Sequence, residues 1–127
     1  MENHLLTATL YNNIALCYLK QNKEKQLSIE HLLRALAIRE NLSDPTDLEL
    51  ANNYHNLGLL YKEEEQFDNA LIQLKKALDV RETLYGSFDS ELLNELRIMA
   101  QIYGDIKNVD MQSRVISRIK GIEEENS

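Results

Sequence analysis

Apolar residues recur every three or four positions along most of the chain, a spacing that places them on one side of an α-helix. Polar runs such as QNKEK, NLSDPTD and YGSFDSE interrupt the pattern. β-branched residues are sparse and mostly isolated, which also favours an all-α fold. The pattern therefore predicts six amphipathic helices, near residues 4–21, 25–42, 46–64, 67–85, 89–105 and 108–124.

The longer polar runs carry signals for helix ends. NLSDPTD contains Pro45, the sole proline, just before a predicted helix. YGSFDSE contains Gly86 as a stop signal and Asp89 as an N-cap, with the acidic Glu91 in the first turn. Candidate N-cap residues in the earlier run are Ser43, Asp44 and Thr46.

The sequence repeats itself. Tyr11 and Tyr18 align with Tyr54 and Tyr61 at an offset of 43 residues, and the offset becomes 42 after the polar run QNKEK. A third, weaker copy places Tyr103 at the same position as Tyr61. Each copy reads as two helices joined by a short turn, and a fixed period of this length is typical of helical repeat arrays.

Gly58 stands in the middle of a predicted helix, where glycine costs about 1 kcal/mol relative to alanine. The residues aligned with it, Ala15 and Ala100, are also very small, and Ala70 is small at the start of the next helix. Small residues on facing helices allow a close approach of the two axes. We therefore expect tight packing between the two helices of each copy, a kink at Gly58 being the alternative.

These residues resemble the tetratricopeptide repeat. The paired asparagines, the longer helices and the repeated ALxxRExL run (35–42 and 77–84) are similar to the kinesin light chain type of that repeat. The resemblance implies an all-α solenoid of about three helix-turn-helix units. The residues of the second copy that fill the family pattern are Tyr54, Leu57, Gly58, Tyr61, Phe67, Ala70 and Ala77.

We expect one array over residues 1–127, with repeats at about 4–42, 46–86 and 89–124. The third repeat departs from the pattern, because Gln112 and Ser113 stand where a small packing residue is expected. Its second helix could act as a terminal cap. Alternatively, the chain is a fragment of a longer array.

In a stacked array the first helix of each unit lines the concave side. Helical spacing selects the residues of those helices that face the groove, and many of them are amides, which both donate and accept hydrogen bonds. The expected partner-binding residues are Asn12, Asn13, Leu16, Lys20, Asn52, His55, Asn56, Leu59, Lys62, Asn94, Arg97 and Gln101. The resemblance implies that Asn13 and Asn56 hold the main chain of a bound peptide.

An asparagine on a helix face can also be an ordinary solvated residue, and for Asn12 and Asn52 both interpretations stay open. The groove has few cations, Lys20, Lys62 and Arg97, with acidic residues nearby. A strong clamp for a C-terminal carboxylate is therefore not expected, and an apolar or mildly basic peptide fits better.

Charge and cysteine content limit the class of partner and the cellular compartment. The net charge of −7 opposes binding to nucleic acid. No apolar run is long enough for a membrane span, and the N-terminus does not read as a signal peptide. Cys17 is the only cysteine and cannot form an internal disulfide, which favours a reducing compartment. We expect a cytoplasmic protein.

Catalytic motifs are absent from the sequence: it has no glycine-rich phosphate loop, nucleophile elbow or HExxH. His4, His31 and His55 are widely spaced and suggest neither a catalytic group with Cys17 nor a metal site. We expect no enzymatic activity, no cofactor and no metal.

The sequence therefore predicts a scaffold that binds a protein or peptide in its groove. The alternative is self-association, or docking of further repeats, through an exposed face of the last helix. The apolar residues expected on that face are Met111, Val115, Ile116, Ile119 and Ile122.

Overall fold

The chain folds into a stack of helices, seen in a computed structural model that describes residues 7–8, 10–11, 13, 25–42 and 47–127. The elements are α2 (Lys25–Leu42), α3 (Leu48–Glu63), α4 (Phe67–Tyr85), the 3-10 turn η1 (Ser90–Leu92), α5 (Leu93–Asp105) and α6 (Val109–Glu125). The described residues contain no strand. Of the helix expected over 4–21, residues 7, 8, 10, 11 and 13 are helical, and the remainder lies outside the described residues.

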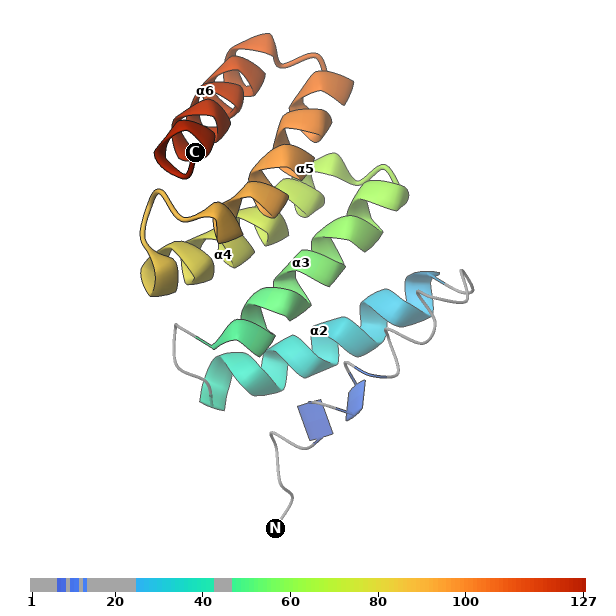
Figure 1. Ribbon diagram of the computed structural model, residues 1–127. Helices are drawn as coiled ribbons and strands as arrows, with labels where there is room; N and C mark the ends of the chain where they lie inside the picture. Colours follow the sequence, from blue (N-terminus) through green and yellow to red (C-terminus); the bar gives the residue numbers. More distant parts are fainter. Residues whose placement is uncertain (1–6, 9, 12, 14–24, 43–46) are drawn as a thin grey trace.

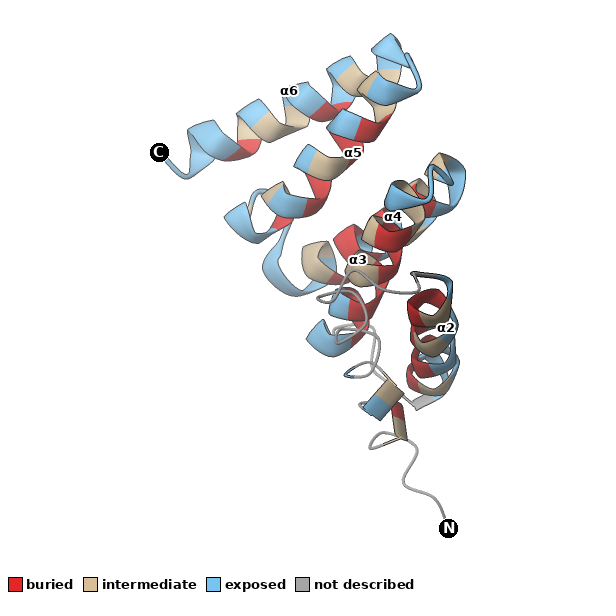
Figure 2. Ribbon diagram, turned by 90° about the vertical axis from the view of Figure 1, so that its right-hand side faces the viewer, coloured by how far each residue is buried: buried red, intermediate tan, exposed pale blue. Residues whose placement is uncertain are grey.

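The helices are stacked in chain order, with α2 at one end and α6 at the other (Figures 1 and 2). Each helix packs mainly against its neighbours in the chain, most closely within the pairs α3–α4 and α5–α6. This arrangement is the expected solenoid of helix-turn-helix units. The predicted bounds 25–42 and 67–85 agree with α2 and α4 residue for residue.

The repeat has a constant length in the structure. Lys25, Phe67 and Val109 begin the second helices of the three units, each 42 positions after the previous one. The turns repeat as well, because Glu65 and Lys107 both adopt positive φ, 58° and 61°. In both turns the next amide closes back onto the carbonyl oxygen of an aromatic residue, at 2.8 Å from Gln66 to Tyr61 and from Asn108 to Tyr103.

Helix caps follow the sequence signals with one correction. Asp89 caps η1 as expected, its side chain accepting from the Glu91 N–H at 2.8 Å, and Gly86 ends α4 with φ at 91°. The N-cap of α3 is Asp47, which accepts from the Glu49 N–H at 2.9 Å. The expected helix start at 46 was therefore early. Asp47 was not among the expected N-cap residues, and the three that were, Ser43, Asp44 and Thr46, lie outside the described residues.

The core is continuous along the stack. One cluster joins α2, α3 and α4 around Leu32, Leu57 and Leu60, and a second joins α4, α5 and α6 around Leu96 and Ile102. Tyr61 packs against both clusters. Burial of a large aliphatic side chain contributes about 1.5–3 kcal/mol, so this shared core is the main stabilising contribution.

In the irregular third unit, the large side chain of Gln112 fills the space that the small residue Gly104 leaves on the facing helix. Gln112 stands where the second unit has Ala70, and its side chain lies over Gly104 and donates from Nε2 to the Ala100 carbonyl oxygen at 3.2 Å. The absent side chain at Gly104 provides the space. Gln112 is therefore half-buried and hydrogen-bonded, whereas Ser113 is exposed.

Candidate functional site

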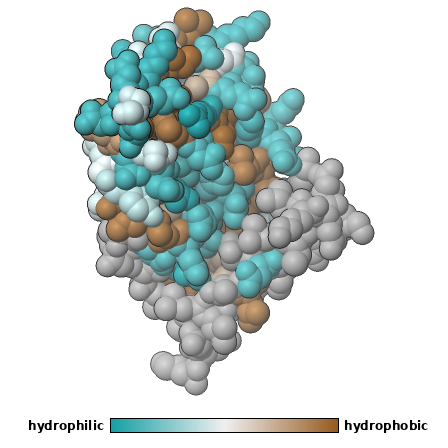
Figure 3. Space-filling view, viewed as in Figure 1, coloured by the Kyte–Doolittle hydropathy of each residue, from teal (hydrophilic) through white to brown (hydrophobic). Residues whose placement is uncertain are grey.

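The expected binding residues of the second and third units lie on neighbouring helices, α3 and α5. Two side-chain contacts join these helices: Lys62 Nζ donates to Gln101 Oε1 at 2.8 Å, and His55 Nδ1 lies 3.1 Å from Glu95 Oε1. We call the surface formed by Asn52, His55, Asn56, Leu59, Lys62, Asn94, Arg97 and Gln101 the α3–α5 face. All eight are exposed or half-buried. Hydrophilic side chains cover most of the described surface in Figure 3, and hydrophobic ones form small patches.

Several of these residues already have partners within the protein. Asn52 Oδ1 accepts from Arg81 Nη2 at 2.8 Å, and Arg97 Nη2 donates to Glu123 Oε2 at 3.1 Å. Together with the Lys62–Gln101 and His55–Glu95 contacts, these bonds fix most of the charged and imidazole groups of the face. Such groups position the helices, and a ligand would have to compete for their hydrogen bonds.

The remaining amides keep their hydrogen-bonding capacity. Among the described residues, the side chains of Asn13, Asn56 and Asn94 make no hydrogen bond. Asn13 and Asn94 are exposed, and Asn56 is half-buried beside the half-buried Leu59. An amide side chain offers two donor hydrogens and one carbonyl acceptor, which match the groups of a peptide backbone. Asn12, Leu16 and Lys20 lie outside the described residues.

A buried carboxylate lies beneath the α3–α5 face. Glu95 is fully buried, and its Oε1 accepts from Arg81 Nε at 2.9 Å and lies beside His55. Burial raises the pKa of Glu95, but the hydrogen bond from His55 and the charge and hydrogen bond of Arg81 outweigh it. The pKa of Glu95 is therefore lowered from 4.5, and the carboxylate stays ionised inside the stack.

Sequence reasoning missed Glu95, although a signal was present. Glu95 aligns with Asn53 in the preceding unit, and both polar side chains are fully buried. The arginine of the ALxxRExL run supplies the partner: Arg81 pairs with Glu95, and Arg39 pairs with Asp47 and Glu49 at the start of the next unit. A recurring arginine followed by an acid in the next unit indicates an inter-repeat ion pair.

The surface expected on the last helix is smaller than predicted. Val115 and Ile122 are buried in the core of the third unit, and Met111 and Ile119 are half-buried. Ile116 is exposed. The expectation of a continuous apolar face over these five residues was wrong for Val115 and Ile122, because α6 turns that side toward α5.

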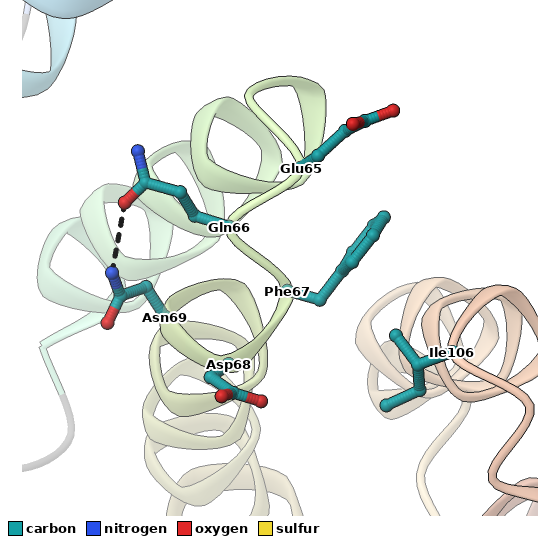
Figure 4. A pocket seen from close by; sticks show the side chains of 6 residues that line it. All are labelled: Glu65, Gln66, Phe67, Asp68, Asn69 and Ile106. Carbon is teal, nitrogen blue, oxygen red and sulfur yellow. Dashed lines mark hydrogen bonds between the residues drawn. The ribbon is translucent and has the colours of Figure 1, made fainter.

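A shallow hollow of ≈ 470 Å³ lies between the α3–α4 turn and the end of α5. Phe67 and Ile106 project into the space between these elements (Figure 4), and Glu65 and Asp68 add carboxylates at its edge. Asn69 Nδ2 donates to Gln66 Oε1 at 3.1 Å on the other side. The hollow is open to solvent and mixes apolar with acidic groups, so it offers no convergent set of polar atoms for a small ligand.

The described part of the chain holds no group of three or more His, Cys, Asp or Glu side chains that could bind a metal ion. Within the same part, none of the helices has the length and apolar character needed to cross a membrane.

A curated relative and a solved structure place the chain among known proteins. The chain is 36% identical over 77 residues to "Protein HGV2" of Halocynthia roretzi, an alignment that covers 55% of this chain and 15% of that protein. In fold it is similar to BtubC (BKLC) from P. vanneervenii, with a TM-score of 0.79 and 24% identity over 92% of this chain and 46% of that one. The chain thus spans less than half the length of either protein, and the second likeness concerns the fold alone.

The sequence profile of the tetratricopeptide repeat family matches residues 7–83, which include α2, α3 and most of α4. The expected array of tetratricopeptide repeats is confirmed by this match, and the fold agrees with it. Residues beyond the match continue the same 42-residue period in η1, α5 and α6. The chain belongs to the tetratricopeptide repeat family.

Proposed function

We propose that the chain is a non-catalytic scaffold that binds an extended peptide segment of a partner protein along the α3–α5 face and at Asn13. Tetratricopeptide arrays are in general protein–protein interaction scaffolds, which supports this class of function. The observation that carries the finer proposal is the pair Asn13 and Asn56. These aligned amides occupy equivalent repeat positions and make no side-chain hydrogen bond among the described residues.

The chemistry of the face favours a peptide backbone over a strongly charged ligand. Lys62 and Arg97 already bond to Gln101 and Glu123, and Arg81 balances the buried Glu95. The amides of Asn56 and Asn94 remain for main-chain groups, and Leu59 offers apolar contact. We propose a protein partner rather than nucleic acid, because the net charge of −7 repels phosphates. The single cysteine favours a cytoplasmic setting.

The test begins with selection of linear peptides from a random displayed library against the purified chain. Binding of an enriched peptide is then measured by fluorescence polarisation with the double variant Asn13→Ala/Asn56→Ala. Loss of two hydrogen bonds, at about 0.5–1.5 kcal/mol each, should raise Kd by about 5- to 150-fold. Thermal melting should change little, because neither amide bonds within the described protein.

Asn69→Ala is the matched control, since it removes an exposed amide on α4 away from the α3–α5 face. It should leave Kd unchanged. Equal binding by the double variant and the wild type would refute the proposed site. A melting temperature that falls together with affinity would show that the two amides are structural.

A further inference from the structure

A second hollow, of ≈ 240 Å³, lies between the second helices α4 and α6, with α5 forming its floor. Its apolar lining includes Leu78, Leu96, Met99, Met111 and Val115. The cations that line it are Lys75, Arg114 and Arg118. None of these residues belongs to the α3–α5 face.

The lining of this hollow is basic, although the chain as a whole is acidic. The chain has a net charge of −7, yet none of the described residues that line the hollow is an acid, and the nearest carboxylates are those that pair with its two arginines. Lys75 has no ionic partner in the part of the chain that the structure describes. Arg114 pairs with Asp110 at 3.4 Å, and Arg118 with Glu82 at 3.0 Å. The Arg114–Asp110 ion pair is largely exposed and therefore contributes little net energy. The guanidinium of Arg114 can therefore exchange Asp110 for a carboxylate of a ligand at little cost.

The preceding unit does not have the same combination. One repeat earlier, Arg114 is replaced by Ile72, Lys75 by Leu33 and Met111 by Asn69. A different hollow lies between α2 and α4, further along these helices, and it is lined by the acids Glu40 and Asp79 as well as by Lys76, the residue one repeat before Arg118. The basic rim and apolar floor are therefore special to the α4–α6 junction, where α6 departs from the repeat pattern.

We propose that this hollow docks an acidic segment of a partner protein. One or two apolar side chains of the segment enter the hollow, and flanking carboxylates pair with Lys75 and Arg114. The volume is below the range of about 300–1,000 Å³ for small-molecule pockets, which suits a few anchoring side chains. Met99 and Met111 can adjust to the shape of an apolar anchor, because methionine side chains are flexible and polarisable.

Charge complementarity is what selects this occupant. Lys75, Arg114 and Arg118 would repel a basic segment. They attract an acidic segment, which the rest of the acidic surface repels. The site is separate from the α3–α5 face, so one chain can hold two segments at once.

The experiment uses two displayed peptide libraries with a central Leu or Phe, one flanked by Asp and Glu and the other by Lys and Arg. We expect enrichment from the acidic library only. The ε-methyl NMR signals of Met99 and Met111 should shift on titration with an enriched peptide. The charge-reversed variant Lys75→Glu/Arg114→Glu should raise Kd about tenfold or more.

The matched control is Lys107→Glu/Lys120→Glu, which changes the net charge equally and lies outside the hollow. Glutamate already occupies the position equivalent to Lys107 in the preceding unit, Glu65, so the control should fold. It should leave Kd within about twofold of the wild type. The Asn13→Ala/Asn56→Ala variant should also bind normally, which separates this proposal from the peptide site on the α3–α5 face.

Equal weakening by both charge-reversed variants would overturn the proposal, since it would show attraction to the net charge rather than to the hollow. Enrichment of basic peptides would also overturn it. If sedimentation shows that the chain alone forms a dimer, and the variant Lys75→Glu/Arg114→Glu does not, then the occupant of the hollow is a second copy of the chain and the proposal is overturned. Binding to phosphatidylserine vesicles with the same variant dependence, and to no acidic peptide, would assign it to a lipid surface.

Discussion

Gly58 of α3 lies directly against Leu74 of α4. A Cβ at Gly58 would stand 2.9 Å from Leu74 Cγ and 3.3 Å from the carbonyl oxygen of Ala70. Leu74 and Ala70 are fully buried, and the Ala70 carbonyl belongs to the helix backbone, so neither can move away freely. The glycine in the middle of α3 therefore sets how closely the two helices of the second unit approach.

Gly58→Ala should lower the free energy of unfolding by up to about 2 kcal/mol. Overpacking a close helix contact costs about 1–3 kcal/mol, from which the gain of about 1 kcal/mol in helix propensity is subtracted. Urea denaturation followed by far-UV circular dichroism measures the change.

Gly121→Ala is the control for that experiment, because a Cβ at Gly121 would meet nothing within 4 Å. Here the propensity gain acts alone, and the free energy of unfolding should rise by about 0.5–1 kcal/mol. If Gly58→Ala and Gly121→Ala both raised the free energy of unfolding, the packing role of Gly58 would be contradicted.

Gly104 and Gln112 should be energetically coupled. Gln112 Nε2 lies 2.5 Å from the position of a Cβ on Gly104, so Gly104→Ala displaces the glutamine and breaks its hydrogen bond to Ala100. The lost bond, about 0.5–1.5 kcal/mol, roughly cancels the helix-propensity gain. In the Gln112→Ala background the gain remains alone, and Gly104→Ala should stabilise by about 1 kcal/mol. A double-mutant cycle from urea titrations measures the coupling, and strict additivity would contradict it.

Much of the fold could be predicted from the sequence, because it depends on local periodicity. The bounds of α2 and α4 and the packing role of Gly58 follow from residues within one repeat. The candidate surface followed from the same spacing, which placed Asn52, His55, Asn56 and Lys62 on one side of α3. Whether these residues bind a partner stays a prediction.

Contacts between units were harder to predict. Glu95 bonds to residues 14 and 40 positions away, Arg81 and His55, so neither helical spacing nor charge pattern within α5 reveals its burial. Gln112 looked unsuited to packing because its partner, Gly104, lies on the other helix of the pair. Polar residues in a core depend on partners that the periodicity of one helix cannot specify.

Tyr54 should ionise later than an ordinary tyrosine. Burial, followed by the charge of Glu40 and its hydrogen bond with the phenol, raises the pKa of Tyr54 from 10.0 to about 12. The contribution of the neutral Tyr54 phenol to the free energy of unfolding is fully present below pH 10 and is lost as the pH rises toward 12. Ultraviolet titration of the wild type minus Tyr54→Phe isolates this phenol. Glu40→Gln should lower its pKa without restoring 10, since burial remains, and an isolated transition near 10 in the wild type would refute the assignment.

Glu95 should make the stack sensitive to acid. Its pKa is lowered in the folded chain, so its contribution to stability is present above the unfolded value of 4.5 and is lost as the pH falls through the folded value. Glu95→Gln removes this contribution. At neutral pH it should cost roughly 2–3 kcal/mol, somewhat below the full cost of breaking a buried ion pair, because the Arg81 side chain reaches solvent.

The difference in unfolding free energy between the wild type and Glu95→Gln should therefore be constant above about pH 5.5 and should shrink steadily below 4.5. Urea titrations at successive pH values measure this difference. Glu91→Gln is the matched control, since Glu91 is an exposed acid four residues earlier. It should shift stability by less than about 0.5 kcal/mol at every pH. A difference for Glu95→Gln that does not vary with pH would mean that shape, rather than the ionised carboxylate, holds α5 against Arg81 and His55.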